Sequence, residues 1–297
     1  KGCWNLGSCG LGCPTNAKQS MLVTTIPAAL DLGAMLLVQT RAERLELQGE
    51  EVKALICQPI ALNGDAQGAP LRIRARHYVI AGGAINSPGL LLRSAAPDPH
   101  GLLGRRTFLH PTVVSAALFE QRVDAYAGAP QSIYSDHFLA TGAIDGPIGY
   151  KLEAPPLHPV LMATTFAGFG ADHAAAARQF AHQSALLALL RDGFHEGSAG
   201  GTVSLHKDGA PLLDYPLTPY IWDGVRRAYL TMAEIQFAAG ARQVKPIHEQ
   251  AALYTSWAAA KAAIAQLDYK PHLARVVSAH VMGGCGMAGD AVRGVVA

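Results

Sequence analysis

Residues 78–96 carry the sequence YVIAGGAINSPGLLLRSAA, in which an apolar run meets a glycine pair and then a helical pattern. The run 78–84 predicts a buried strand that ends in glycines, and 89–96 predicts a helix. Ser87 suits the N-cap of that helix and Pro88 its first position. A helix that begins directly after such a turn offers free backbone N–H groups to a ligand. Close packing of the helix on the strand explains the glycine pair equally well.

The residues before this stretch predict a meander of strands. Residues 41–47 alternate between polar and apolar side chains and lead into a hairpin turn at 48–50, which is the pattern of a half-buried strand. These elements indicate a first domain over residues 1–107. The other elements expected in it are a short helix at 21–32 closed by Gly33, a buried strand at 35–39, strands at 52–62 and 71–80, and a turn at 63–65.

The residues after 107 differ in composition, because aromatic residues, scattered histidines and many proline or glycine turns occur there. They predict a second domain over residues 108–271, which we expect to be a sheet with helices on one side. Residues 272–297 form a tail that runs from a short strand into a glycine-rich loop. The elements expected after 107 are a strand at 160–166, an alanine-rich helix at 174–190, a turn at 197–201, a strand at 202–206, a turn at 207–209, a helix at 222–239 ended by Gly240, and a strand at 276–277.

The composition excludes several classes of protein. Half of the 297 residues are hydrophobic and 15% are charged, which excludes an intrinsically disordered chain and suits two domains. The net charge of +2 gives no electrostatic reason to expect nucleic-acid binding. No apolar run reaches the roughly 18 residues of a membrane span, and we expect no secretory leader in this fragment, which favours a cytoplasmic location without establishing one. Because the chain begins at Lys1 inside a loop and stops in an apolar run, we expect a fragment of a longer protein.

His280 lies in the glycine-flanked segment SAHVMGGCGM, residues 278–287. Such a histidine lets a substrate approach the imidazole, which titrates near neutral pH and can take up a proton. A structural histidine that bonds a loop carbonyl is the alternative. The chain has no Gly-x-Gly-x-x-Gly fingerprint followed about twenty residues later by an acidic residue, so the glycine pair at 82 and 83 cannot by itself open a dinucleotide-binding domain.

Three cysteines, Cys3, Cys9 and Cys13, lie in a glycine-rich loop at the N-terminus. Their spacing does not match the paired cysteines of zinc ribbons. Three thiolates can hold an iron–sulfur cluster, because the ligands of such clusters are cysteine thiolates in loops. A loop that holds no metal and a disulfide between two of the three are the alternatives.

Five segments together resemble the glucose–methanol–choline (GMC) family of flavin-dependent alcohol oxidoreductases, in the order in which the family carries them. The match to the family's second signature is imperfect, since Ala95 stands where a glycine is usual. The segments are residues 12–20 (GCPTNAKQS), 83–94 (GAINSPGLLLRS), 103–106 (LGRR) with His110 and Pro111, 208–217 (DGAPLLDYPL), and His280 with 283–287 (GGCGM).

The resemblance implies a mixed α/β fold: an incomplete FAD-binding, Rossmann-like domain over residues 1–107, a substrate domain of a sheet plus helices over 108–271, and a return to the flavin site over 272–297. It implies that His280 takes the hydroxyl proton of an alcohol while flavin N5 accepts the hydride. The residues expected to contact FAD are Ala42, Ala81, Gly82, Gly83 and Ser87. The family's Gly-x-Gly-x-x-Gly unit and its second active-site His or Asn would lie outside the chain.

A long-chain alcohol is the substrate that the cysteine loop and the apolar middle section favour. An iron–sulfur-containing sugar or polyol dehydrogenase, in which Cys3, Cys9 and Cys13 bind a cluster, is the second interpretation. An electron-transfer fragment without alcohol chemistry of its own and a non-catalytic relic are further alternatives. For an enzyme we expect a small-molecule alcohol and an electron-acceptor protein as partners.

Overall fold

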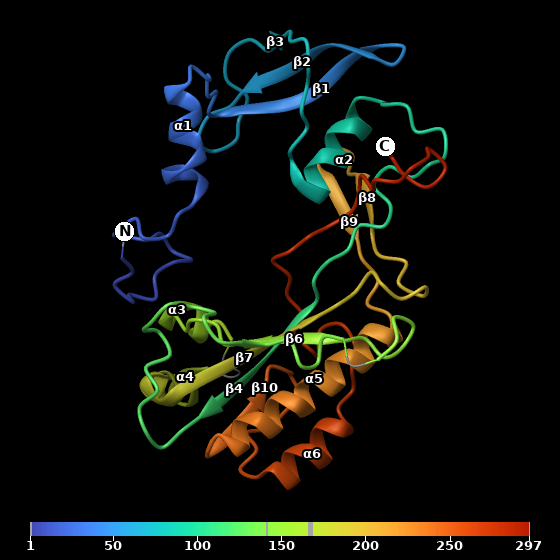
Figure 1. The fold of residues 1–297 in the computed structure, drawn as a ribbon. Helices are drawn as coiled ribbons and strands as arrows, with labels where there is room; N and C mark the ends of the chain where they lie inside the picture. The colour runs from blue at the N-terminus through green and yellow to red at the C-terminus, as the bar shows by residue number, and fades with distance from the viewer. Residues whose placement is uncertain (1, 141, 166–168, 297) are drawn as a thin grey trace. The chain divides into compact units, whose positions relative to one another are not determined.

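The computed structural model describes residues 2–140, 142–165 and 169–296, and the chain divides into two compact units (Figure 1). Each unit is assembled from segments that are far apart in the sequence. Unit 1 consists of Lys1–Thr25, His110–Gly197 and Leu217–Ser278, and unit 2 consists of Ile26–Leu109, Ser198–Pro216 and Ala279–Ala297.

Unit 2 contains a three-stranded antiparallel sheet, the two helices α1 and α2, and a two-stranded ribbon. The hairpin expected around residues 48–50 is present, because β1 pairs with β2 in antiparallel register and closes at Gln48 and Glu51. The short helix before it is also present and ends before Gly33, whose φ is +90°. The elements of unit 2 are α1 (Thr25–Asp31), β1 (Thr40–Gln48), β2 (Glu51–Pro59), β3 (Leu71–Ile73), α2 (Gly83–Arg93), β8 (Thr202–Leu205) and β9 (Pro211–Asp214), and the 3-10 turn Met21–Val23 precedes α1 in unit 1.

The structure corrects the prediction for the stretch that follows β3. Residues 78–81 belong to neither a strand nor a helix, so no sheet runs directly into the helix. Helix α2 begins at Gly83 with Gly82 as N-cap, four residues before Ser87. Pro88 therefore lies inside α2, where it lacks the N–H that would bond the Ala84 carbonyl. The predicted strand at 35–39 is also absent, and Met35 is 85% exposed.

Unit 1 is built on a five-stranded sheet in the order β10-β4-β7-β6-β5, in which every neighbouring pair is antiparallel. The 20-residue helix α5 begins at Pro219, with Thr218 as N-cap, and is followed by Gly240 with φ of +91°. The elements of unit 1 are β4 (Thr112–Leu118), β5 (Tyr134–Ser135), β6 (Tyr150–Glu153), α3 (Pro159–Ala163), α4 (Gly170–Arg178), the 3-10 turn Phe180–His182, β7 (Gln183–Leu190), α5 (Pro219–Ala238), β10 (Gln243–Pro246) and α6 (Trp257–Ala265).

The main core of unit 1 lies between α5 and one face of this sheet. Tyr229 of α5 is completely buried, and its hydroxyl donates to the Ile247 carbonyl at 2.9 Å. Ser115 of β4 donates to Gln236 of α5 at 2.7 Å, so that face of β4 points toward the helix. The alternate residue Val114 packs with Leu157 and with Met162 of α3 on the opposite face. Helices therefore lie against both faces of the sheet, and the expectation of helices on one side is wrong.

Two predictions of local structure in unit 1 are also wrong. The expected alanine-rich helix at 174–190 is the helix α4 followed by the strand β7, which lies between β4 and β6. The segment SALLALL in β7 is apolar enough for either state, and pairing on both sides decides for the strand. A strand was expected at 160–166, but residues 160–163 belong to helix α3, and residue 166 lies outside the described residues.

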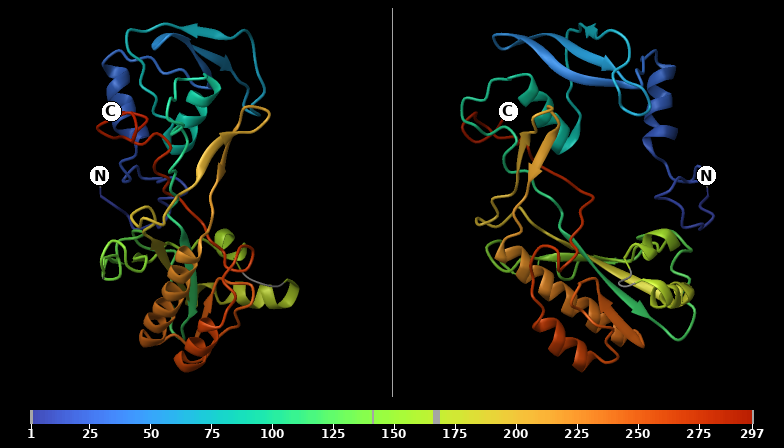
Figure 2. Two further views of the ribbon diagram at one scale, coloured as in Figure 1. Left: turned by 90° about the vertical axis from the view of Figure 1, so that its right-hand side faces the viewer. Right: turned by 180° about the vertical axis from the view of Figure 1, so that it is seen from behind.

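The mixed α/β class is confirmed. The described residues contain only antiparallel pairs between named strands, so they show no parallel βαβ unit. Figure 2 shows β8 and β9 as a ribbon beside α2, and both strands contact that helix. No helix in the described part of the chain is long and apolar enough to cross a membrane.

Candidate functional site

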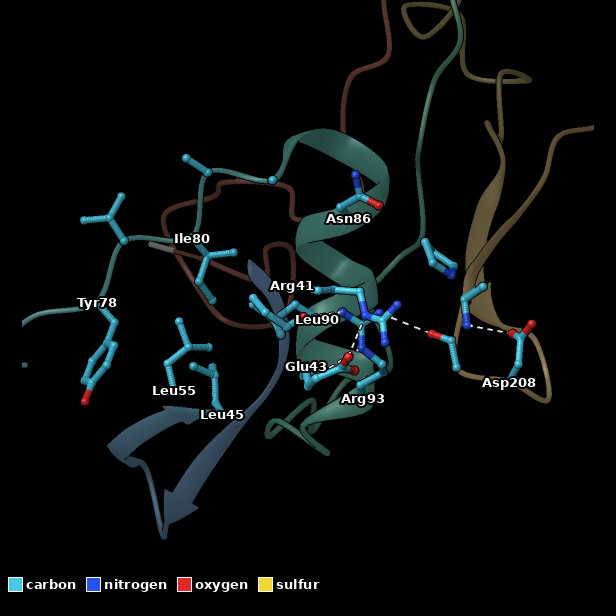
Figure 3. A pocket seen from close by; sticks show the side chains of 17 residues that line it. Arg41, Glu43, Leu45, Leu55, Tyr78, Ile80, Asn86, Leu90, Arg93 and Asp208 are labelled. Atoms are coloured by element: carbon cyan, nitrogen blue, oxygen red, sulfur yellow. Dashed lines mark hydrogen bonds and ion pairs between the residues drawn. The ribbon is translucent and has the colours of Figure 1, made fainter. Parts of the chain in front are cut away.

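A cavity of about 760 Å³ lies in unit 2 beside α2 (Figure 3). One wall comes from β1 and β2, a second from residues 78–82 and a third from the turn between β8 and β9. The apolar side chains of Leu45, Leu55 and Ile80 lie along one part of it. The complete lining is Arg41, Ala42, Glu43, Leu45, Leu55, Tyr78, Val79, Ile80, Ala81, Gly82, Asn86, Leu90, Arg93, Asp208, Gly209, Ala210 and Pro211.

Arg93, at the last turn of α2, holds the walls of this cavity together. Its guanidinium donates to the carbonyls of Glu43 at 2.9 Å and Ala42 at 3.2 Å on β1, and to the carbonyl of Gly209 at 3.2 Å. The next residue, Ser94, accepts from the Leu45 N–H at 2.8 Å. The planar guanidinium can bridge several carbonyls at once, which a lysine ammonium on its flexible stem does less precisely.

Small residues let the β8–β9 ribbon approach α2 closely. A Cβ at Gly89 would lie 3.0 Å from Cβ of Pro211, so the ribbon rests on the helix backbone. Gly209 has φ of +82°, and Asp208 accepts from the Ala210 N–H at 2.9 Å to close the turn. Backbone hydrogen bonds and the neighbouring His206 hold the pKa of the Asp208 carboxyl below its usual range, so it is a carboxylate near neutral pH.

The segment that carries His280 packs against the first turn of α2. A Cβ at Gly284 would lie 2.5 Å from the Ala84 carbonyl oxygen, and one at Gly283 would lie 1.9 Å from the Arg106 carbonyl oxygen. Phe108 and Met282 exchange backbone hydrogen bonds of 2.8 and 2.9 Å, which fixes the segment in unit 2. His280 is exposed and is not among the residues that line the cavity.

The same segment contains Gly284, Gly286 and Gly289, which have the Gly-x-Gly-x-x-Gly spacing that the interpretation of the sequence did not consider. In a dinucleotide-binding unit this motif follows a strand and opens a helix. Here residues 284–289 lie in a loop with bends and one isolated bridge, at Met287. The spacing therefore has a different structural meaning, which is close packing at Gly284.

The N-terminal cysteine loop belongs to unit 1, where Cys3, Cys9 and Cys13 line one small cavity. A side-chain hydrogen bond with Thr15, followed by the N–H of Lys18, lowers the pKa of the Cys13 thiol to about 7. Within the described ranges, no group of three or more Cys, His, Asp or Glu side chains is arranged to hold a metal ion.

The structure thus brings some of the expected site residues together. Ala42, Ala81 and Gly82 line one cavity, whereas Gly83 and Ser87 lie on the adjoining helix α2. Arg93 was not predicted as a site residue. A lone arginine at a helix end gives no signal in one sequence, because its carbonyl partners come from segments 50 and 116 residues away.

Comparison with known proteins supports one family. Residues 1–112 match the family model described as GMC oxidoreductase. The chain is 26% identical over 244 residues to an "Uncharacterized GMC-type oxidoreductase" of Sinorhizobium fredii, covering 82% of this chain and 45% of the relative. It is 30% identical over 244 residues to a protein of that description from Mycobacterium tuberculosis, covering 82% and 36%. A "Long-chain-alcohol oxidase" of Arabidopsis thaliana is 24% identical over 253 residues, covering 80% and 32%.

The chain therefore spans less than half the length of each of these relatives. The family match covers the cysteine loop, β1 to β3 and α2. Within it, β1, β2, residues 78–82 and α2 supply most of the lining of the cavity in unit 2. Residues 1–112 belong to the GMC oxidoreductase family, and most of the remaining chain is related to GMC-type oxidoreductases.

Proposed function

We propose that this chain is part of an FAD-dependent oxidoreductase that oxidises the CH–OH group of an alcohol. The observation that carries the proposal is the cavity of about 760 Å³ beside α2, within and next to the segment that matches the GMC family. In this proposal residues 1–107 and 272–297 serve the flavin and residues 108–271 serve the substrate, apart from the turn 208–211, which lines the cavity proposed for the flavin.

The lining of the cavity fits the adenosine half of FAD. Leu45, Leu55 and Ile80 offer an apolar surface for a flat ring, and the small residues Ala42 and Gly82 line the cavity beside them. Neither arginine of the cavity is available to bind the pyrophosphate, because Arg93 already donates to three carbonyls and Arg41 pairs with Glu43 at 2.5 Å. We therefore propose that Ala42, Ala81, Gly82, Gly83 and Ser87 surround the adenosine, and that other backbone donors hold the phosphates.

His280 is the proposed base. An alcohol carbon becomes a good hydride donor when the hydroxyl proton leaves, and a neutral imidazole nitrogen can accept that proton near pH 7. A bound flavin supplies the hydride acceptor. The close contact of Gly284 with Ala84 ties the His280 segment to the helix that begins at the glycine pair, which supports a role for this histidine near the cofactor.

A long-chain alcohol is the proposed substrate class. The relative from Arabidopsis thaliana bears the name long-chain-alcohol oxidase, and that likeness covers 80% of this chain. A sugar or polyol has several hydroxyl groups that need hydrogen-bond partners in the site, whereas a long-chain alcohol has one. The rates of oxidation of a series of sugars, polyols and aliphatic alcohols would therefore distinguish the two classes.

The test replaces His280 in the flavin-loaded protein. We expect His280→Asn to lower the rate of flavin reduction by a saturating aliphatic alcohol by roughly 100- to 10,000-fold, as loss of a general base does, with unchanged flavin content. His100→Asn, at an exposed histidine of the same unit, is the matched control and should reduce at the rate of the parent protein. Reduction of the His280→Asn protein at the parent rate would contradict the assignment of the base.

The second candidate is an iron–sulfur-containing dehydrogenase that passes electrons to an acceptor protein. The observation in its favour is that three thiols line one small cavity in the N-terminal loop. Iron and acid-labile sulfide in the anaerobically purified protein, lost together in Cys13→Ser, would support this candidate. Absence of both from the parent protein would leave the flavin as the proposed redox group.

A further inference from the structure

The N-terminal loop of unit 1, drawn in dark blue in Figure 1, holds three of the five cysteines of the chain. Cys3, Cys9 and Cys13 are free thiols that line one small cavity, whose volume of about 10 Å³ is room for about one water molecule. Cys3 is exposed and the other two are half-buried, so solvent reaches all three. The three thiols therefore lie close to one another and within reach of a small oxidant.

Hydrogen bonds distinguish Cys13 from the other two thiols as the reactive one. Its Sγ accepts from the Lys18 N–H at 3.5 Å and lies 3.5 Å from the Thr15 hydroxyl oxygen. Donors directed at a sulfur favour the thiolate, which is the form of cysteine that attacks an oxidant. The Sγ of Cys3 accepts from the Asn5 N–H at 3.3 Å but also donates to Asn5 Oδ1 at 3.5 Å, which requires the thiol to keep its proton.

Cys9 is the thiol that the loop presents as a partner for Cys13. The ammonium of Lys18 donates to the Cys9 carbonyl at 2.9 Å, while its N–H donates to the Cys13 sulfur, so one residue contacts both cysteines. A Cβ at Gly10 or Gly12, between the two cysteines, would meet nothing within 4 Å. The segment between the cysteines is therefore unconstrained at both glycines and can bend to bring the two sulfurs into bonding distance.

The other two cysteines of the chain provide an internal comparison. Cys57 is only 4% exposed and Cys285 is half-buried, and burial raises the pKa of both thiols. Neither of them lines the cavity in the N-terminal loop. We expect both to react with an oxidant more slowly than Cys13 does.

We propose that Cys13 and Cys9 form a peroxide-sensitive pair, in which hydrogen peroxide oxidises Cys13 and Cys9 then closes a disulfide with it. The Cys13 sulfur attacks one oxygen of the peroxide and breaks the O–O bond, which leaves a sulfenic acid on Cys13 and releases hydroxide. The Cys9 sulfur then attacks the sulfenic sulfur, and the sulfenic oxygen leaves as water. In sum, two thiols are oxidised to a disulfide and one peroxide is reduced to two water molecules.

This modification goes beyond the proposed function, because it needs neither a flavin nor an alcohol. The modification and the flavin chemistry can therefore fail separately. It is incompatible with the iron–sulfur candidate, because a thiolate that binds iron cannot at the same time enter a disulfide. Analysis of iron in the same preparation distinguishes the two uses of the loop.

The test locates the oxidised thiols in the parent protein after treatment with hydrogen peroxide at pH 7. Free thiols are blocked with N-ethylmaleimide, disulfides are reduced, and the released thiols are labelled with iodoacetamide. Trypsin then gives residues 2–18 as one peptide, in which fragmentation by mass spectrometry assigns each label. We expect the second label on Cys9 and Cys13, and the first label on Cys3, Cys57 and Cys285. Dithiothreitol added before the first label should reverse the change.

Substitutions in the loop test the role of each thiol. Cys13→Ser should prevent oxidation in the loop, and Cys9→Ser should stop at the sulfenic acid of Cys13, which dimedone traps. Cys3→Ser is the matched control and should form the disulfide at the parent rate. Thr15→Val keeps the shape of the side chain but removes its hydroxyl. It should slow the oxidation by about three- to tenfold, which is the value of one hydrogen bond.

Four results would overturn the proposal. Bound iron and acid-labile sulfide in the parent protein would show that the thiols are cluster ligands. Five blocked thiols after peroxide treatment, or oxidation of Cys57 or Cys285 before Cys13, would show that the loop is not the reactive site. A disulfide in Cys9→Ser would assign the partner thiol to Cys3. Oxidation of Thr15→Val at the parent rate would show that the hydrogen bond does not activate Cys13.

Discussion

Individual residues in this protein act mainly through the backbone groups that they bind. Arg93 joins β1 to the β8–β9 turn by hydrogen bonds to three carbonyls, and Gly284 allows the His280 segment to touch the first turn of α2. His248 behaves in the same way: its Nδ1 accepts from the Gln250 N–H at 3.1 Å, and its Nε2 lies 3.2 Å from the Asp268 carbonyl. Only the neutral imidazole with its proton on Nε2 can make both of these hydrogen bonds.

His248 should make the stability of unit 1 dependent on pH. Burial is the main reason that its pKa lies below the ordinary value of 6.5. The unfolded chain therefore binds a proton at higher pH than the folded chain, so the stability that neutral His248 contributes is complete above pH 6.5 and is lost as the pH falls through the folded pKa. We expect Tm to decrease as the pH is lowered from 6.5. This one group changes the free energy of unfolding by at most about 1.4 kcal/mol per pH unit.

The measurement is thermal unfolding between pH 7.5 and pH 5 for the parent, His248→Asn and His272→Asn. The decrease in Tm should be smaller in His248→Asn, because its titrating imidazole is gone. His272 is exposed, so His272→Asn should keep the decrease of the parent. Parallel curves for the parent and His248→Asn would contradict the prediction.

At the scale of elements, the neighbour of a segment decides its structure when the segment itself is ambiguous. The apolar residues of β7 suit a helix as well as a strand, and pairing with β4 and β6 selects the strand. Helix α5 is unambiguous because it has an N-cap at Thr218 and Gly240 just past its end. Its close fit to the sheet depends on Gly224, since a Cβ there would lie 2.2 Å from Cγ2 of Ile148 and 2.7 Å from Cδ2 of Leu190.

Gly224→Ala should destabilise the protein even though alanine is the better helix former. Helix propensity favours the substitution by roughly 1 kcal/mol, but Ile148 and Leu190 are buried and cannot easily move away from the new methyl group. We expect a net loss of about 1–3 kcal/mol of unfolding free energy, measured by urea denaturation. Glu234→Ala, at an exposed position of α5, is the control and should change it by less than about 0.5 kcal/mol. A more stable Gly224→Ala protein would show that the sheet yields at this point.

For the whole molecule, the division into two units cuts across the order of the sequence. Residues 198–216 form the β8–β9 ribbon of unit 2 although unit 1 supplies the residues on both sides of them. Each unit has buried apolar residues of its own, such as Tyr229 and Met232 in unit 1 and Leu45 and Val203 in unit 2. Separate cores favour separate cooperative transitions.

We expect scanning calorimetry to resolve two transitions that respond to different substitutions. Gly283 has φ of +86°, and a Cβ added there would meet the Arg106 carbonyl. Gly283→Ala should therefore lower the free energy of unfolding of unit 2 alone, by at least about 1 kcal/mol, and move only the transition of that unit to lower temperature. Gly224→Ala should lower only the transition of unit 1, and the double variant should show both decreases, additive to within about 0.5 kcal/mol. A single transition that moves with either substitution would show that the units unfold together.

The sequence by itself determined the mixed class, the β1–β2 hairpin, strand β8 with the turn after it, helix α5 and the family, because turn residues, helix caps and short motifs are local signals. Only the tertiary structure decided that 183–190 is a strand, that 78–81 pairs with no strand and that helices cover both faces of the large sheet. It also brought Ala42, Gly82 and Gly209 to one cavity, where Arg93 donates to the carbonyls of Ala42 and Gly209, and it left Gln183 Oε1 buried without a hydrogen-bond partner among the described residues. These features depend on contacts between residues far apart in the chain, and no local pattern of side chains carries that information.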